Sequence, residues 1–314
     1  MSLRGRFAPS PTGRLHLGNA RSALLGWLQA RAAQGQFLLR VEDLDRARCR
    51  PQYVDDLMRD MEWLGLTWDE TPLFQSARDE VYREALGQLE QEGLVYPCFC
   101  TRAEIARAAS APHGLSEEGP RYPGTCARLS SAERAERSRT RAPAYRFRAP
   151  LGEVRFVDRL QGPYTQDVAE AVGDFVVRRN DGVASYQLAV VVDDAATAIS
   201  HVLRGDDLLS STPRQLQLYT ALRLPAPAFF HVPLVLGEDG KRLAKREGAF
   251  ALAELRERGL PAERVLGLLA AWSGLGDGAP VSLEELVKRF RPEQLPRAPV
   301  TAREQTIVAA LGLA

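Results

Sequence analysis

The N-terminal part of the chain has the pattern of a strand, a turn, a helix and a strand, and this order constrains the fold more than any other feature. Residues 4–13, RGRFAPSPTG, predict a short strand that runs into a turn, because two prolines and a glycine interrupt regular structure. The pattern of residues 19–33 is helical, and residues 36–43, QFLLRVED, predict a buried strand. Two strands joined through a helix in this way form the unit from which parallel sheets are built.

Farther along the chain, helical and strand-like segments alternate around one irregular stretch. Two amphipathic helices are predicted at residues 54–64 and 81–89 by the helical spacing of their apolar side chains. Residues 96–150 change to Cys, Pro, Gly, Ser and Arg with weak periodicity, which indicates an insertion. Strand-like runs then return, interrupted by one helical segment at 213–223, and they cover residues 174–179, 185–192, 200–205 and 229–237.

This pattern predicts an α/β protein whose parallel sheet is split by a smaller module. After residue 250 the segments are helical: Ser282 and Glu285 form a capping box at the start of one helix, and residues 301–313 predict the last one. We therefore expect a first half of the sheet domain, an insertion, a second half and a helical C-terminal region. Their predicted bounds are 1–95, 96–150, 151–250 and 251–314.

Composition excludes several classes of protein. The apolar runs are far shorter than the roughly 20 residues that cross a bilayer, and the N-terminus lacks the apolar core of a secretory signal. Four cysteines in 314 residues do not make a disulfide scaffold, so a reduced, cytoplasmic setting is the simplest expectation. The net charge of +1 does not by itself indicate a nucleic-acid-binding protein.

One segment is nevertheless strongly basic. Residues 121–148 contain eight arginines and only two glutamates, Glu133 and Glu136. Two interpretations stay open at this point: a solvated surface, or a surface that contacts the phosphates of a nucleic acid.

The turn before the first predicted helix has the composition of an anion site. Residues 10–20, SPTGRLHLGNA, lie between a strand and a helix N-terminus, where free backbone N–H groups and the helix dipole favour negative charge. Gly18 lets a ligand approach the backbone, and His16 can donate to a phosphate oxygen. Glycine-containing turns of this kind are common, so a purely structural histidine stays an alternative.

Several strings together resemble one enzyme family. The H-x-G-N of residues 16–19 and the KRLAKR of residues 241–246 resemble HIGH and KMSKS, the two signature motifs of class I aminoacyl-tRNA synthetases. The strings RFAPSPTGRLHLGNARSALL, LLRVEDLDR, LAVVVDDA and HVLRGDDLLSSTPRQLQLY are similar to the glutamyl-tRNA synthetase family. The resemblance runs from residue 6 to about residue 250 in the family's order. It implies a Rossmann-type catalytic core that activates an amino acid with ATP and Mg²⁺.

The resemblance assigns a role to the lysine-bearing segment. In the family a mobile loop brings a lysine to the ATP phosphates, and Lys245 matches the second lysine of the signature. Arg242 and Ala244 replace the first lysine and the serine, which leaves Lys241 as support. Only three of the 41 basic side chains are lysines, so two in this segment indicate a need for a compact ammonium group. The residues implied for ATP are His16, Gly18, Asn19 and Lys245, of which His16 and Lys245 are catalytic.

The resemblance also implies selection of glutamate by cations aimed at a carboxylate. Arg6 would grip the side-chain carboxylate and Glu42 the α-ammonium group, and Arg suits bidentate binding of a carboxylate. The alternative is that Arg6 and Glu42, at adjacent strand ends, only pair with each other. The residues implied for glutamate are Arg6, Phe7, Ala8, Pro9, Ser10, Glu42, Tyr186 and Arg204.

The insertion carries three of the four cysteines, and Cys49 stands apart. A Cys-x-Cys pair followed by RYPGTC is by its spacing a poor zinc signal. Related synthetases, however, hold a structural Zn²⁺ here with cysteines and a Tyr or His. His113 as a ligand, or three buried thiols without metal, stay open as alternatives. The zinc ligands that the resemblance implies are Cys98, Cys100, Tyr122 and Cys126.

The length of the chain indicates which branch of the family it resembles. Arg246 is followed by 68 residues, whereas an anticodon-reading domain takes on the order of 100 residues. This resembles the branch of the family that lacks such a domain, activates glutamate without tRNA and attaches it to queuosine, the wobble base of tRNA(Asp). The expected partners are L-glutamate, ATP and the anticodon stem-loop of that tRNA, which the basic segment would contact, with no membrane and with a monomer as the simplest state. A truncated glutamyl-tRNA synthetase core and a non-catalytic paralogue that binds glutamate or tRNA stay as alternatives.

Overall fold

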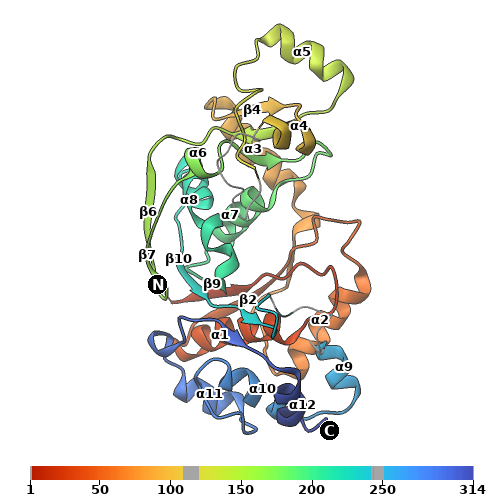
Figure 1. The fold of residues 1–314 in the computed structure, drawn as a ribbon, viewed down its shortest axis with the longest axis vertical. Coiled ribbons are helices and arrows are strands. Elements are labelled where there is room, and N and C mark those ends of the chain that lie inside the picture. The colour runs from red at the N-terminus through yellow and green to blue at the C-terminus, as the bar shows by residue number, and fades with distance from the viewer. Residues whose placement is uncertain (1, 109–119, 242, 244–250, 314) are drawn as a thin grey trace.

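The computed structural model describes residues 2–108, 120–241, 243 and 251–313, and a parallel sheet lies at its centre (Figure 1). The strands of this sheet are β1 (Arg4–Phe7), β2 (Gln36–Val41), β3 (Leu73–Phe74), β9 (His201–Gly205) and β10 (Ala228–Val232). β2 pairs with β1 on one side and with β3 on the other, and β9 pairs with β10, each time in parallel. The strand, helix and strand predicted at the N-terminus are therefore confirmed.

β1 and β9 join these two groups of strands. The N–H of Ser200 donates to the carbonyl of Arg4 (3.0 Å), and the N–H of Arg4 donates to Oγ of Ser200 (2.9 Å). At their other ends, Phe7 and Arg204 line one cavity, so the two strands run in the same direction. The spatial order is thus β3, β2, β1, β9, β10. It brings the carboxyl ends of strands from both halves of the chain together at one end of the sheet.

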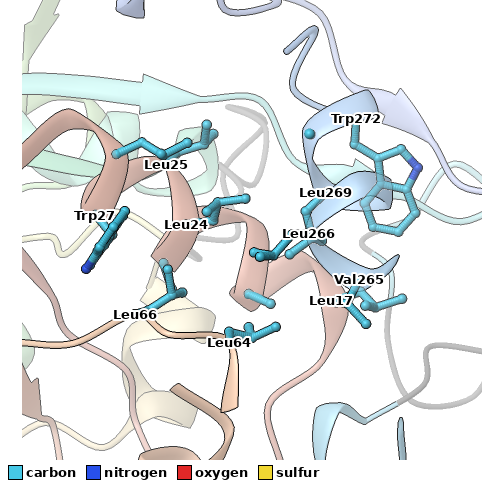
Figure 2. Packing of buried hydrophobic residues seen from close by; sticks show 14 of the residues in the cluster. Leu17, Leu24, Leu25, Trp27, Leu64, Leu66, Val265, Leu266, Leu269 and Trp272 are labelled. Atoms are coloured by element: carbon cyan, nitrogen blue, oxygen red, sulfur yellow. The ribbon is translucent and has the colours of Figure 1, made fainter. Parts of the chain in front are cut away.

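Helix α1 (Leu17–Ala32) is buried on nearly all sides, which explains why its apolar residues are not confined to one face. One side packs on β1 and β2, and the other contacts α10 (Ala262–Ala271) and α11 (Leu283–Arg289). Figure 2 shows Leu17 and Leu24 of α1 in one cluster with Leu266 and Leu269 of α10. The predicted helical C-terminal region is therefore confirmed, and it forms part of the main hydrophobic core.

Other C-terminal elements tie this region to the rest of the core. α9 (Leu252–Glu257) packs on α2 (Pro51–Trp63), α12 (Glu304–Leu311) packs on α10, and β12 (Val300–Thr301) pairs with β11 (Val235–Leu236). Only half of the predicted capping box forms: Oγ of Ser282 accepts from the N–H of Glu285 (3.3 Å), but the carboxylate of Glu285 pairs with Arg289 and not with the backbone of Ser282.

The predicted insertion has a small antiparallel sheet of its own. β5 (Ala144–Phe147) lies between β4 (Val95–Cys98) and β8 (Phe175–Arg178), and both pairings are antiparallel. The strand predicted at residues 174–179 is confirmed as β8, but it pairs with β5 of the insertion and not with the parallel sheet. Between β4 and β8 the chain also forms α4 (Arg102–Ala108), α5 (Ser131–Thr140), the hairpin of β6 (Glu153–Asp158) and β7 (Gly162–Asp167), and α6 (Val168–Ala171). Of these elements, β6 contacts β10 of the parallel sheet.

One prediction of secondary structure is wrong. Residues 185–192, SYQLAVVV, read as a strand but form the start of helix α7 (Tyr186–Ala196). Ser185 caps this helix, since its Oγ accepts from the N–H of Leu188 (3.4 Å), and every residue from 187 to 194 is buried. A continuous apolar run does not distinguish a buried strand from a buried helix, and packing between α3 (Asp79–Gln91) and α8 (Thr212–Ala221) selects the helix here.

Short 3₁₀ turns complete the fold at Gln75–Ala77, Asp206–Ser211 and Pro292–Gln294. None of the helices in the described ranges combines the length and the apolarity that spanning a bilayer requires.

Candidate active site

A cavity of ≈ 680 Å³ opens at the carboxyl ends of β1, β2 and β9, where parallel sheets ordinarily bind their ligands. The N-terminus of α1 and the segment after β10 form further walls. The structure brings together here every predicted glutamate- or ATP-binding residue that it describes. These residues are Arg6, Phe7, Ala8, Pro9, Ser10, His16, Gly18, Asn19, Glu42, Tyr186 and Arg204.

Backbone hydrogen bonds hold the turn between β1 and α1. The N–H of Glu42 donates to the carbonyl of Pro9 (3.0 Å), and that of Thr12 donates to the carbonyl of Ser10 (2.8 Å). The first of these bonds ties the turn to the end of β2. The residues that follow both strands therefore face the same cavity.

His16 is the N-cap of α1, and this changes the expected anion site. Its Nδ1 accepts from the N–H groups of Gly18 (3.2 Å) and Asn19 (3.4 Å). The expectation that these N–H groups are free for a phosphate is therefore wrong, because the imidazole already satisfies them. With Nδ1 as an acceptor, the proton of a neutral ring lies on Nε2. A Cβ at Gly18 would lie 3.1 Å from Cε1 of His16, so glycine leaves room for the ring in this position.

Arg6 and Glu42 lie in one buried network of ion pairs. Nε of Arg6 lies 3.1 Å from Oδ1 of Asp194, and Nη1 of Arg40 lies 2.5 Å from the same oxygen. Nη2 of Arg40 also lies 3.1 Å from Oε1 of Glu42. No ion pair joins Arg6 directly to Glu42, and both are described residues. The alternative that these two side chains only pair with each other is therefore wrong, because Asp194 and Arg40 lie in the network between them.

Burial and the guanidinium groups together set the charge of the two carboxylates. Burial raises the pKa of Glu42, and Arg40 and Arg6 offset only part of that rise. Burial acts in the same direction on Asp194, but there Arg40 and Arg6 outweigh it and hold the pKa below its ordinary value. Asp194 is thus the fixed anion of the network, whereas Glu42 lines the cavity with a carboxylate that a substrate cation would stabilise.

Arg204 differs from Arg6 in its partners. Its side chain is only 5% exposed, and burial lowers its pKa. Within the described ranges its hydrogen bonds go to neutral groups, and no carboxylate forms an ion pair with it. These groups are Nε2 of His231, Oγ1 of Thr212 and Oε1 of Gln215, each at 2.9 Å, the carbonyl of Leu208 and the hydroxyl of Tyr186, both at 3.4 Å.

The charges at this end of the cavity do not balance. Among the described residues, Arg6 and Arg40 form ion pairs with two carboxylates, those of Asp194 and Glu42, and Arg204 forms none. With both carboxylates ionised, these five side chains carry one positive charge in excess, in a region largely removed from water. Burying an uncompensated charge is costly, so this end of the cavity favours a ligand that brings one net negative charge.

Sequence reasoning missed three buried residues of this site. Asp194 and Arg40 organise the network, but in the sequence Asp194 follows an apolar run and Arg40 lies within one, and only their unusual burial would have marked them. Arg21 lines the cavity from α1, where Nε donates to Oγ of Ser273 (3.0 Å) and Nη1 to the carbonyl of Pro233 (2.6 Å). Its Nη2 is buried without a hydrogen-bond partner among the described residues.

Lys245 lies outside the described residues, but its described neighbours are tied to the cavity. The N–H of Leu243 donates to the carbonyl of Val235 (2.9 Å), and Ala251 forms a β-bridge with His16. Val235 and His16 both line the cavity. His113 also lies outside the described residues.

The structure brings Cys98, Cys100 and Cys126 together, with their sulfur atoms within 4.8 Å of one another. The hydroxyl of Tyr122 lies among them, 3.3 Å from Sγ of Cys98 and 4.0 Å from Sγ of Cys100. Sγ of Cys126 also accepts from the N–H of Phe99 (3.4 Å). A tetrahedral zinc ion with Zn–S bonds of about 2.3 Å places its sulfur ligands at about the separation seen here. The four predicted ligands therefore fit an ion of the size of Zn²⁺ that prefers thiolate ligands.

Residues 2–307 match the family described as tRNA synthetases class I (E and Q), catalytic domain. The chain belongs to this class I synthetase family. It is 54% identical over 320 residues to the glutamyl-Q tRNA(Asp) synthetase of Symbiobacterium thermophilum, with 99% of each chain covered. It is 51% identical over 296 residues to that of Nocardia farcinica, with 94% of this chain and 91% of the relative covered.

A solved structure of the class I synthetase family agrees with this assignment. The glutamate tRNA ligase from Elizabethkingia meningosepticum, in complex with its amino acid, matches with a TM-score of 0.84 at 27% identity. The match covers 99% of this chain and 69% of the ligase. The predicted class I catalytic core and the resemblance to the glutamyl-Q branch are confirmed, and so is the prediction that the chain is an enzyme, a ligase of the aminoacyl-tRNA synthetase type.

Proposed function

We propose that this protein activates L-glutamate with ATP and Mg²⁺ in the absence of tRNA and transfers the glutamyl group to queuosine in the anticodon of tRNA(Asp). The relatives that match over nearly their whole length carry the name of that activity. The cavity supplies the physical argument for its first half.

The unbalanced charge at the end of the cavity carries the proposal. Zwitterionic glutamate has two carboxylates and one ammonium group, so it brings the one negative charge that Arg6, Arg40 and Arg204 leave uncompensated. Glutamine has the same shape and no net charge, and it would leave Arg204 without a counter-ion. We assign the side-chain carboxylate to Arg6 and Arg204, with Tyr186 beside it, and the ammonium group to Glu42.

The other end of the cavity suits ATP. We assign the phosphates to the N-terminus of α1, where the helix dipole and Nε2 of His16 favour negative charge, with Gly18 and Asn19 at the same turn. Arg21 and the backbone from Pro233 to Val235 form the wall that would face the nucleoside. Lys245, through the segment between Leu243 and Ala251, would neutralise charge on the departing pyrophosphate.

Two transfers make up the proposed reaction. An α-carboxylate oxygen of glutamate attacks the α-phosphorus of ATP, and the bond to the bridging oxygen breaks to release pyrophosphate. A hydroxyl of queuosine then attacks the acyl carbon of the glutamyl adenylate, AMP leaves, and a phosphate oxygen of AMP takes the hydroxyl proton. Both steps use the same cavity, so the acceptor can be a modified base instead of a tRNA 3′ end.

The insertion is our candidate for the surface that contacts the stem-loop. Arg137, Arg139 and Arg141 are exposed on and after α5, at the opposite end of the molecule from the C-terminal helices (Figure 1). Exposed guanidinium groups of this kind bind phosphates without reading sequence.

We also propose that the cysteine cluster holds a structural Zn²⁺ through Cys98, Cys100, Tyr122 and Cys126. When bound, the ion would cross-link β4 to the segment that carries Tyr122 and would have no role in the chemistry. The ring of Tyr122 is held in place by the guanidinium of Arg146, 3.8 Å from its centroid.

The division at residues 95, 150 and 250, the monomeric state and the cytoplasmic setting remain parts of this proposal. Size-exclusion chromatography with light scattering would test the monomer.

One pair of assays tests the function. Glutamate-dependent exchange of labelled pyrophosphate into ATP should proceed without RNA, and labelled glutamate should then attach to tRNA(Asp) only when queuosine is present. A truncated charging enzyme would need tRNA for exchange and would label tRNA regardless of queuosine. A non-catalytic paralogue would give no exchange.

A further inference from the structure

Arg204 is hydrogen-bonded to His231, which in turn contacts Asp158. These two buried side chains do not line the cavity that would hold glutamate and ATP. His231 and Arg204 are register partners on the parallel strands β10 and β9, and Nε of Arg204 lies 2.9 Å from Nε2 of His231. Nδ1 of His231 lies 2.6 Å from Oδ2 of Asp158, at the end of β6. The side chains of Asp158 and His231 are both 0% exposed, so this row of three side chains reaches the cavity only through Arg204.

The backbone fixes which atoms of the pair donate and which accept. Three N–H groups donate to Oδ1 of Asp158, and they belong to Leu160 (2.9 Å), Gln161 (2.8 Å) and His231 (3.2 Å). The carboxylate cannot turn without breaking these bonds, so Oδ2 is left to accept from Nδ1–H of His231. The neutral ring with its proton on Nδ1 then presents a lone pair at Nε2, the acceptor that Nε–H of Arg204 requires.

We infer that Asp158 and His231 are positioning residues for substrate recognition: they keep the imidazole in its neutral Nδ1–H form and thereby orient Arg204 toward the carboxylate of glutamate. This inference rests on the proposed function, in which Arg204 contacts the substrate. The other tautomer would turn an N–H of His231 toward an N–H of Arg204, and two opposed donors displace the guanidinium. Loss of the pair therefore weakens the binding of glutamate and leaves the binding of ATP unchanged.

Two substitutions of His231 by amide side chains distinguish a role in orienting Arg204 from a role in filling the core. In His231→Gln the side-chain oxygen falls near the former Nε2 and accepts from Arg204, whereas in His231→Asn the amide reaches only the former Nδ1. In the pyrophosphate exchange assay we expect His231→Asn to raise KM for glutamate about 10-fold or more, and His231→Gln to raise it less than about threefold. KM for ATP stays within about twofold in both variants.

A change at Asp158 tests the relay without touching Arg204. In Asp158→Asn the three backbone donors keep the amide oxygen at the former Oδ1, so the amide nitrogen faces Nδ1 of His231. The ring proton then moves to Nε2 and opposes Nε–H of Arg204. Asp158→Asn should therefore raise KM for glutamate about as much as His231→Asn does.

Tyr96→Phe is the matched control, because it removes a different, partly buried hydrogen bond, from Tyr96 to Asp174 (2.6 Å), in a strand that does not line the cavity. It should change neither KM. An unchanged KM for glutamate in folded His231→Asn, or equal rises in both KM values across the three variants, overturns the inference. Absence of glutamate-dependent exchange in the wild-type protein overturns the proposed function instead.

A second measurement is independent of activity. Nitrogen-15 NMR of the imidazole at pH 7 should show His231 neutral and protonated at Nδ1 in the wild-type protein, and protonated at Nε2 in Asp158→Asn. A wild-type ring protonated at Nε2, or at both nitrogens, rules out the proposed positioning.

Discussion

Oδ1 of Asp194 lies 3.1 Å from Nε of Arg6 and joins a carboxylate of α7 to a cavity-lining cation of β1 across 188 positions of the chain. The same oxygen accepts from Nη1 of Arg40, so one buried anion orients two arginines. Arg6 therefore pairs with Asp194 and not with Glu42, and it lines the cavity.

Asp194→Asn should destabilise the fold by about 3 kcal/mol, because it leaves two buried cations without their shared anion. Urea denaturation of the variant and the wild-type protein measures the change. Glu136→Gln is the control, since it removes an exposed ion pair with Arg139 and should cost less than about 1 kcal/mol. Equal effects of the two substitutions would contradict the assigned role of Asp194.

Arg204→Gln should narrow the preference for glutamate over glutamine. The variant loses the uncompensated positive charge, so kcat/KM for glutamate should fall about 100-fold or more, while the small value for glutamine changes less. Pyrophosphate exchange with each amino acid gives both values. Arg14→Gln is a suitable control, because Arg14 lines the same cavity but pairs with Asp56, and it should leave the ratio of the two values unchanged. An unaltered ratio in Arg204→Gln would contradict the charge argument.

Tyr122→Phe should lower zinc affinity about 10-fold or more, since it removes one of four ligands while the ring can keep its contact with Arg146. Competition with a chromophoric chelator measures the affinity, and elemental analysis of the wild-type protein should find about one zinc ion per chain. Tyr96→Phe, which removes a hydroxyl from the same sheet, should have no effect. Equal affinities in the two variants would exclude Tyr122 as a ligand.

Stability should fall in mild acid because of His231. Burial lowers the pKa of His231 to about 4; the hydrogen bond that His231 donates to Asp158 opposes this shift, and the charge of Arg204 adds to it. The unfolded chain binds a proton at about pH 6.5 and the folded chain does not, so His231 contributes a loss of about 3 kcal/mol as the pH falls from about 6.5 to about 4. The unfolding free energy of His231→Gln should lack this part of the pH dependence. Parallel pH profiles of the two proteins would show that His231 does not titrate in this way.

The sequence predicted the fold best where short-range signals agree. The prolines and glycine after the first strand and the helical pattern that follows predicted the β1, α1, β2 unit, and Ser282 predicted the start of α11. The error at residues 185–192 has a physical cause. A run of buried apolar residues has no polar face, so its periodicity cannot distinguish a helix from a strand, and only the packing of α7 between α3 and α8 decides.

For the candidate site, too, some features could be predicted from the sequence and others only from the tertiary structure. The sequence by itself determined which residues follow the strand ends, and so it was enough to name Arg6, Glu42, His16 and the cysteine cluster as candidate functional residues, because local turns and motif order carry that information. Only the tertiary structure decided which charges meet: Asp194 reaches Arg6 and Arg40, His231 reaches Arg204, and the N–H groups of α1 turn to His16. These contacts join residues from separate elements, and their strength depends on a burial that no short stretch of sequence contains.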